Sequence, residues 1–246
     1  MSGSSVEEVL VVAHNGDVMM RQKAALWLGA NAPAEAGRAI VDLLVSEVDD
    51  AVIETLTWAA VAARSHSTKT IVEALERDDL DEVTTTRLLH ALSKLEAPTT
   101  VEVVRRFAND QRPIVAAKAW WALARIGAPE TLADITDHLG VSSPDQREAL
   151  IRALVQWGPS AVEELSDDDS VVRSQAAEAL IRIADPDARG VMPRRDHQVE
   201  AGVEQALEAL RTAEAHEVDD VLLLLADDPH GGPLKVIVTD LMEARS

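Results

Sequence analysis

A repeated pattern of small residues and leucine is the strongest constraint on how this chain can fold. Six segments carry it, and each segment can be aligned on one final small or turn residue. The aligned residues lie 32, 32, 31, 31 and 26 positions apart: Ala32, Arg64, Glu96, Gly127, Gly158 and Ala184. One such unit cannot bury its own apolar face, so a period of about 31 residues predicts a stacked array.

Each repeat reads as a pair of helices, because apolar residues recur at the i, i+3, i+4 and i+7 spacing of a helix. The second helices are predicted within 20–33, 52–64, 83–98, 114–129, 146–159 and 171–186. The shorter first helices are predicted within 34–46, 68–77, 99–109, 130–139 and 160–165. Prolines open the first helices and acidic turns precede the second ones, where they can cap free amides. No segment alternates like a strand, so the fold class is all-α.

Two segments carry a family resemblance, Met20–Gly29 (MRQKAALWLG) and Val172–Ile181 (VRSQAAEALI). They resemble HEAT repeats in the short bacterial form of the bilin-lyase type, and the likeness extends over about 17–186. The resemblance implies a right-handed α-solenoid of stacked two-helix repeats. It also implies that an arginine near the start of the second helix bonds to the backbone or to the Asp of the adjacent turn. The matching arginines are Arg21, Arg147 and Arg173.

The domain organisation is predicted as one continuous solenoid. Residues 1–186 hold six clear repeats, 187–198 form a loop, and 199–246 form a degenerate repeat with capping helices. The helices of this last part are predicted at Val199–Ala213, Val218–Ala226 and Leu234–Ala244.

Charge is unevenly distributed along the chain. The 246 residues contain 23 Lys and Arg against 43 Asp and Glu, a net charge of −20. The six 14-residue windows that end at the aligned residues hold 11 basic and 5 acidic residues, whereas the rest of the chain holds 12 and 38. Second helices line the concave surface in HEAT arrays. An acidic protein is therefore expected to carry a basic inner strip.

The candidate binding residues lie on the polar side of the second helices, two, six and nine positions before the aligned residues. Two tryptophans share the sixth position in two repeats, and tryptophan and arginine often anchor protein interfaces. The expected partner-binding residues are Trp58, Arg87, His90, Lys94, Lys118, Trp121, Arg125, Arg152 and Arg182. The alternative is a solvated, ion-paired helix face, with Trp58 and Trp121 tucked between repeats.

The other three tryptophans, Trp27, Trp120 and Trp157, fall on the apolar side of their helices and are expected in the core.

Several classes of function find no support in the sequence. The absence of cysteine excludes disulfide scaffolds, Cys-ligated zinc, iron–sulfur clusters and thiol catalysis. There is no P-loop, dinucleotide fingerprint, nucleophile elbow or H-E-x-x-H motif. HEAT-like deoxyhypusine hydroxylases carry several His-Glu pairs, whereas this chain has one, at His216-Glu217. HEAT-like alkyl-base DNA glycosylases have an Asp where Ala122 stands here. We therefore expect no catalytic residue, no cofactor and no metal site.

These observations favour a non-catalytic HEAT-repeat scaffold that binds an acidic segment or helix of a protein partner in a basic, tryptophan-containing groove. The alternatives are a nucleic-acid-binding protein, which the net charge disfavours, and a bilin-lyase-like chaperone or lyase. No apolar run approaches the roughly 20 residues that span a membrane, and no secretory signal is evident. We therefore expect a cytoplasmic protein of bacterial or archaeal type.

Overall fold

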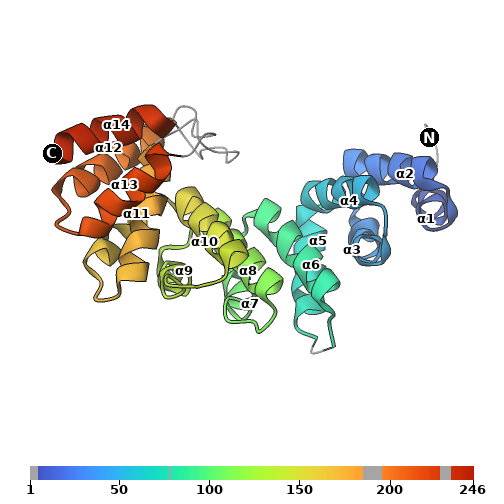
Figure 1. Cartoon of the computed structure of the whole chain (residues 1–246). Coiled ribbons are helices and arrows are strands. Elements are labelled where there is room, and N and C mark those ends of the chain that lie inside the picture. Colours follow the sequence, from blue (N-terminus) through green and yellow to red (C-terminus); the bar gives the residue numbers. More distant parts are fainter. Residues whose placement is uncertain (1–4, 78, 185–195, 228–233) are drawn as a thin grey trace. The chain divides into compact units, whose positions relative to one another are not determined.

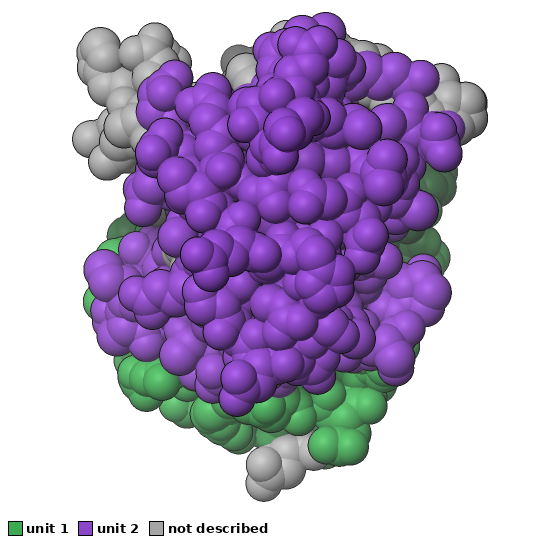
Figure 2. Space-filling model, turned by 60° about the vertical axis from the view of Figure 1, so that its left-hand side comes forward, with its two compact units in different colours: residues 1–122 green, residues 123–246 purple. Residues whose placement is uncertain are grey.

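The computed structural model describes residues 5–77, 79–184, 196–227 and 234–246. Within these residues every regular element is a helix, which confirms the predicted all-α class (Figure 1). The chain divides into two compact units, Met1–Ala122 and Leu123–Ser246 (Figure 2). Among the described residues, no helix is long and apolar enough to cross a membrane.

The six predicted second helices are all present. They are α2 (Val18–Asn31), α4 (Asp50–Ala62), α6 (Glu82–Leu95), α8 (Pro113–Ile126), α10 (Pro144–Trp157) and α11 (Ser170–Ala184). Acidic turns cap α2, α4 and α6 as expected: a carboxylate oxygen of Asp17, Asp49 or Asp81 accepts a backbone N–H from the first turn of the helix that follows it. Each cap satisfies an amide that has no partner inside its helix.

Four aligned residues have left-handed or otherwise positive-φ backbone, which ends their helices sharply. The φ angles are 39° at Ala32, 48° at Glu96, 65° at Gly127 and 117° at Gly158. The second repeat differs, because Arg64 is the first residue of α5 (Arg64–Leu75) and not a turn residue.

Two first helices are well developed, α3 (Gly37–Ser46), which follows the short 3₁₀ turn η1 (Ala34–Ala36), and α5. The next ones are shorter than predicted. Each begins as a 3₁₀ turn at a proline, η2 (Pro98–Thr100) before α7 (Val101–Arg105) and η3 (Pro129–Thr131) before α9 (Ala133–Thr136). The buried hydroxyls of Thr100 and Thr131 donate to the carbonyl three residues earlier, which favours a turn over a continuous helix.

The segment predicted as a helix at 160–165 is also different, because it forms the 3₁₀ helix η4 (Pro159–Ser166).

Further helices precede and follow the six second helices in the chain. An unpredicted helix, α1 (Val6–Asn15), packs on α2 and starts with a reciprocal capping box between Ser5 and Glu8. At the other end lie α12 (Asp196–Thr212), α13 (His216–Ala226) and α14 (Leu234–Arg245). Residues 196–198 were predicted as loop but belong to α12, while 187–195 lie outside the described residues.

The core is built from the small residues and leucines that define the repeat. Leu28, Leu92, Leu123, Leu154 and Leu180, each four positions before its aligned residue, are completely buried. Such burial is worth about 2 kcal/mol or more for each leucine.

Of the three tryptophans expected in the core, Trp120 is buried, and its indole N–H donates to the carbonyl of Ala108 at 3.0 Å. Trp27 and Trp157 are only half-buried, so the prediction was wrong for them.

Candidate functional site

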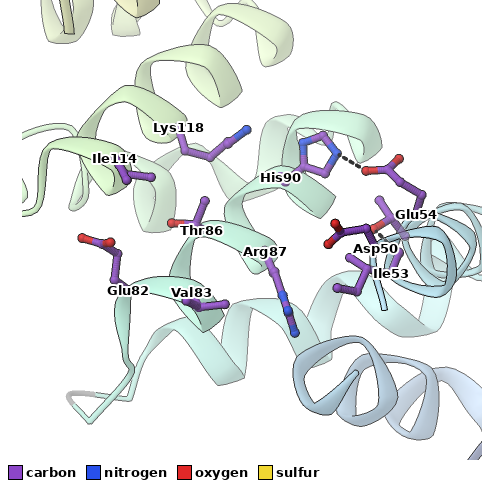
Figure 3. Close-up of a pocket in the computed structure, with 11 residues that line it drawn as sticks. Asp50, Ile53, Glu54, Glu82, Val83, Thr86, Arg87, His90, Ile114 and Lys118 are labelled. Atoms are coloured by element: carbon purple, nitrogen blue, oxygen red, sulfur yellow. Dashed lines mark hydrogen bonds and ion pairs between the residues drawn. The ribbon is translucent and has the colours of Figure 1, made fainter. Parts of the chain in front are cut away.

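A hollow of about 440 Å³ opens between the second helices α4, α6 and α8 of the first unit (Figure 3). We call it the α4–α6–α8 pocket. It is lined by Asp50, Ile53, Glu54, Thr57, Glu82, Val83, Thr86, Arg87, His90, Ile114 and Lys118. Its lining combines aliphatic side chains with charges of both signs.

Three of the expected binding residues, Arg87, His90 and Lys118, come together in this pocket. The aliphatic residues Ile53, Val83 and Ile114 were not anticipated as binding residues. Val83 and Ile114 stand thirteen positions before their aligned residues. They are therefore seven positions before His90 and Trp121, which occupy the sixth position of the predicted polar side. Seven residues make about two helical turns, so Val83 and Ile114 lie on the same side of their helices as the predicted binding residues. This spacing could have identified them from the sequence.

Carboxylates also line the pocket. Asp50 and Glu82 belong to the first turns of α4 and α6, where the positive end of the helix dipole stabilises them. Glu54 lies one turn further along α4 and faces His90 (Figure 3). The acidic side chains of the pocket therefore lie near the helix starts, and its cationic side chains lie further along α6 and α8.

Arg87 has a structural role besides lining the pocket. Its Nη1 donates to the carbonyl oxygens of Glu47 and Val45, at 2.6 and 3.0 Å, at the end of α3. The Glu47 carboxylate in turn accepts two hydrogen bonds from Arg21 of α2, at 2.8 and 2.9 Å. Arg21, Glu47 and Arg87 thus link three successive repeats.

The repeat arginines bond partly as the family resemblance implied. Arg21 donates to the carbonyl of Gly16, and Arg173 donates to those of Asp167 and Asp168, as expected. Their carboxylate partners, however, are not turn aspartates. They are glutamates from a following element: Glu47 for Arg21, Glu178 for Arg147 and Glu217 for Arg173.

His90 has charged neighbours of both signs, Glu54, Lys94 and Lys118. Its Nε2 is 3.6 Å from Glu54 Oε1. Burial lowers the pKa of His90, and Lys118 and Lys94 lower it further, while Glu54 acts in the opposite direction. The lowered pKa favours the neutral form of the imidazole. Within the described part of the chain, His90 Nδ1 and Thr86 Oγ1 are buried without a hydrogen-bond partner.

Trp58 lies on α4 and is half-exposed, outside the pocket lining. Its ring packs on Gly29 of α2, so closely that an added Cβ at Gly29 would overlap the six-membered ring. One side of the Trp58 side chain thus contacts the neighbouring repeat, while the other side faces solvent.

The remaining expected residues lie on four helices. Lys94 is exposed on α6, Trp121 and Arg125 are half-buried on α8, and Arg152 is exposed on α10. Arg182 of α11 donates twice to Glu178, at 3.0 and 2.8 Å, and Glu178 also pairs with Arg147. Arg182 is therefore part of an ion-pair network. Among the described residues, no group of three or more His, Asp or Glu side chains is placed to hold a metal ion.

Comparison with known proteins identifies the repeat. A family model of HEAT repeats matches residues 68–155. No curated protein matches the sequence.

Among solved structures, the complex of CpcE and CpcF of phycocyanin lyase from Nostoc sp. PCC7120 is 19% identical, with 99% of this chain and 95% of that chain covered and a TM-score of 0.46. Human deoxyhypusine hydroxylase in complex with glycerol is 15% identical, with 98% and 95% covered and a TM-score of 0.43. Values this low carry no inference about activity or partner. The family match includes α6 and α8 of the pocket, and residues 68–155 consist of HEAT repeats.

Proposed function

We propose that this protein is a non-catalytic HEAT-repeat scaffold that binds a segment of a protein partner on the second helices. The observation that carries the proposal is the α4–α6–α8 pocket, where exposed aliphatic side chains adjoin Lys118 and His90. Apolar burial would supply most of the affinity, while the charges would set orientation and association rate. Within the same unit, the expected binding residues Trp58, Lys94 and Trp121 would extend the contact beyond the pocket.

Nucleic acid is the weaker candidate ligand. The net charge of −20 repels phosphate. The pocket itself is rimmed by Asp50, Glu54 and Glu82. A protein segment can satisfy both the apolar and the charged side chains.

The test is affinity capture from a nuclease-treated lysate, with wild type beside the double variant Lys94→Glu, Lys118→Glu. Arg87 is left unchanged because it holds the end of α3. The matched control is Lys69→Glu, Lys235→Glu, which reverses two exposed lysines on α5 and α14.

We expect a protein that is captured by wild type and by the control and is lost with the double variant. Trp121→Ala should weaken the same complex by about 2 kcal/mol, the usual scale of an interface anchor. Capture that depends on intact nucleic acid would instead favour the nucleic-acid-binding alternative. Equal capture by all three proteins would contradict the proposal.

A further inference from the structure

Exposed apolar side chains repeat at two places along the second helices of the first unit. Thirteen positions before the aligned residues, Met19, Val83 and Ile114 are 64%, 58% and 57% exposed. Six positions before them, Leu26 and Trp58 are 50% and 48% exposed. The two places are seven residues apart, so they lie on one side of each helix about 10 Å from each other.

These side chains form two rows because the helices are neighbours. Helix α2 packs on α4 and α4 on α6, while α6 and α8 share the pocket. Packed helices lie about 8–10 Å apart. The thirteen-before place holds Ala51 in α4, and the six-before place holds His90 in α6 and the half-buried Trp121 in α8. The surface therefore belongs to α2, α4, α6 and α8, and we call it the two-row face.

The charge between the rows is positive. Nine positions before the aligned residues stand Lys23, Arg87 and Lys118. Glu54 also lies between the rows and faces His90. The first-turn acids Asp50 and Glu82 lie outside the rows, at the helix starts. A partner that contacts both rows would therefore place the middle of its contact surface against cationic side chains.

The spacing of the repeats suits a helical partner. Seven residues of a helix rise about 10.5 Å, close to the separation of neighbouring second helices. In a partner helix that lies across α2, α4, α6 and α8, residues seven apart lie on the same side of that helix. Each of them would thus meet the next of these second helices. Residues three and four positions after a central residue flank it on either side of that face. Leucines there would reach the two rows, and a central glutamate would reach the cations between them.

We infer that the two-row face binds an amphipathic helix whose apolar side is divided by a line of acidic residues spaced seven apart. This inference rests on the proposed function and specifies its partner. Apolar contacts come from both rows, with Val83 and Ile114 nearest the pocket. Electrostatic complementarity comes from Lys23 and Lys118 against the acidic line.

The experiment measures fluorescence anisotropy of labelled peptides with the full chain. The probe has three copies of Glu-Ala-Gln-Leu-Leu-Ala-Gln. One control peptide has Lys in place of Glu, and the other has Ser in place of Leu. The protein variants are Val83→Ser, Ile114→Ser, which alters two exposed side chains, and the matched control Leu224→Ser on α13, which is 65% exposed.

We expect the glutamate–leucine probe to bind roughly tenfold tighter than either control peptide, and the Val83→Ser, Ile114→Ser variant to lose roughly tenfold in affinity. Leu224→Ser should bind like wild type. Equal or tighter binding of the lysine peptide, unchanged binding by the double variant, or no binding of any peptide would overturn the inference. If the inference fails in this way while lysate capture still depends on Lys94 and Lys118, the proposed function stands without this partner chemistry.

Discussion

The indole ring of Trp58 on α4 lies against the backbone of Gly29 on α2, in the space that a side chain at position 29 would occupy. Gly29 is buried within a regular helix, where glycine is otherwise unfavourable. Close approach of the two repeats depends on its missing Cβ. Trp58 is therefore both part of the exposed face and a packing element between two repeats.

Gly29→Ala should destabilise the protein by about 1–3 kcal/mol, because the new methyl group overlaps the ring of Trp58. In an unobstructed helix the same change would stabilise by about 0.5–1 kcal/mol, so the sign is informative. Urea unfolding of Gly29→Ala, Trp58→Ala and the double variant gives the coupling energy. We expect the alanine to be harmless once Trp58 is removed. A stabilised Gly29→Ala protein would show that the ring moves aside at no cost.

Glu47→Gln should destabilise the protein at neutral pH by about 2 kcal/mol, since it removes a charge-assisted pair with Arg21. Hydrogen bonding from Arg21, helped by the amides of Asp49 and Val48, lowers the pKa of Glu47 from 4.5 to about 2. A carboxylate with a lowered pKa stabilises the fold fully above pH 4.5, and this contribution is lost as the pH falls towards 2.

The difference in unfolding free energy between wild type and Glu47→Gln should therefore shrink between about pH 5 and pH 2. Glu35→Gln replaces an exposed glutamate in η1 and serves as the control, which should change the unfolding free energy little. A difference that stays constant with pH would mean that the Arg21–Glu47 pair does not control the ionisation.

Ala32→Gly should stabilise the protein by about 0.5–1 kcal/mol, because an L-residue at φ 39° bears a left-handed strain that glycine avoids. The same substitution at exposed Ala30, in the last turns of α2, should cost up to about 1 kcal/mol. Thermal or urea unfolding of the two variants should give opposite signs. Loss of stability in both would place Ala32 in ordinary helical backbone.

The imidazole of His90 should titrate below the usual value near 6.5, because burial and the cations Lys118 and Lys94 lower its pKa against the influence of Glu54. Lys118→Gln should raise that pKa and Glu54→Gln should lower it further. NMR titration of the ring protons measures all three proteins. Because the folded pKa is lowered, His90 reduces stability as the pH falls through about 6.5. A wild-type pKa above 6.5 would show that Glu54 dominates.

The architecture could be predicted because the repeat is encoded locally. The leucines four places before the aligned residues and the capping aspartates each specify their own helix, so all six second helices were found. The first helices were less predictable, since the hydroxyls of Thr100 and Thr131 divert the chain into 3₁₀ turns. Helix α1 was missed although the Ser5–Glu8 capping box is visible in the sequence.

The candidate site was harder to predict because it depends on contacts between repeats. Helical periodicity placed Arg87, His90 and Lys118 on one side of their helices, and the structure brings them to one pocket. Periodicity could not show that Arg87 reaches back to the carbonyls of α3, or that Arg147 of α10 pairs with Glu178 of α11. It also could not show how close Trp58 comes to Gly29, since that distance is set by the packing of two helices.

The central claim is that the exposed face of the second helices in the first unit contacts a protein. Site-specific photo-crosslinking tests it most directly, with the photoreactive residue placed at Val83, at Ile114 or, as a control, at Leu224. All three side chains are exposed. We expect crosslinks from positions 83 and 114 to one shared protein segment, and none to that segment from position 224. Crosslinks to the same protein from position 224 alone, or to nucleic acid from 83 and 114, would contradict the claim.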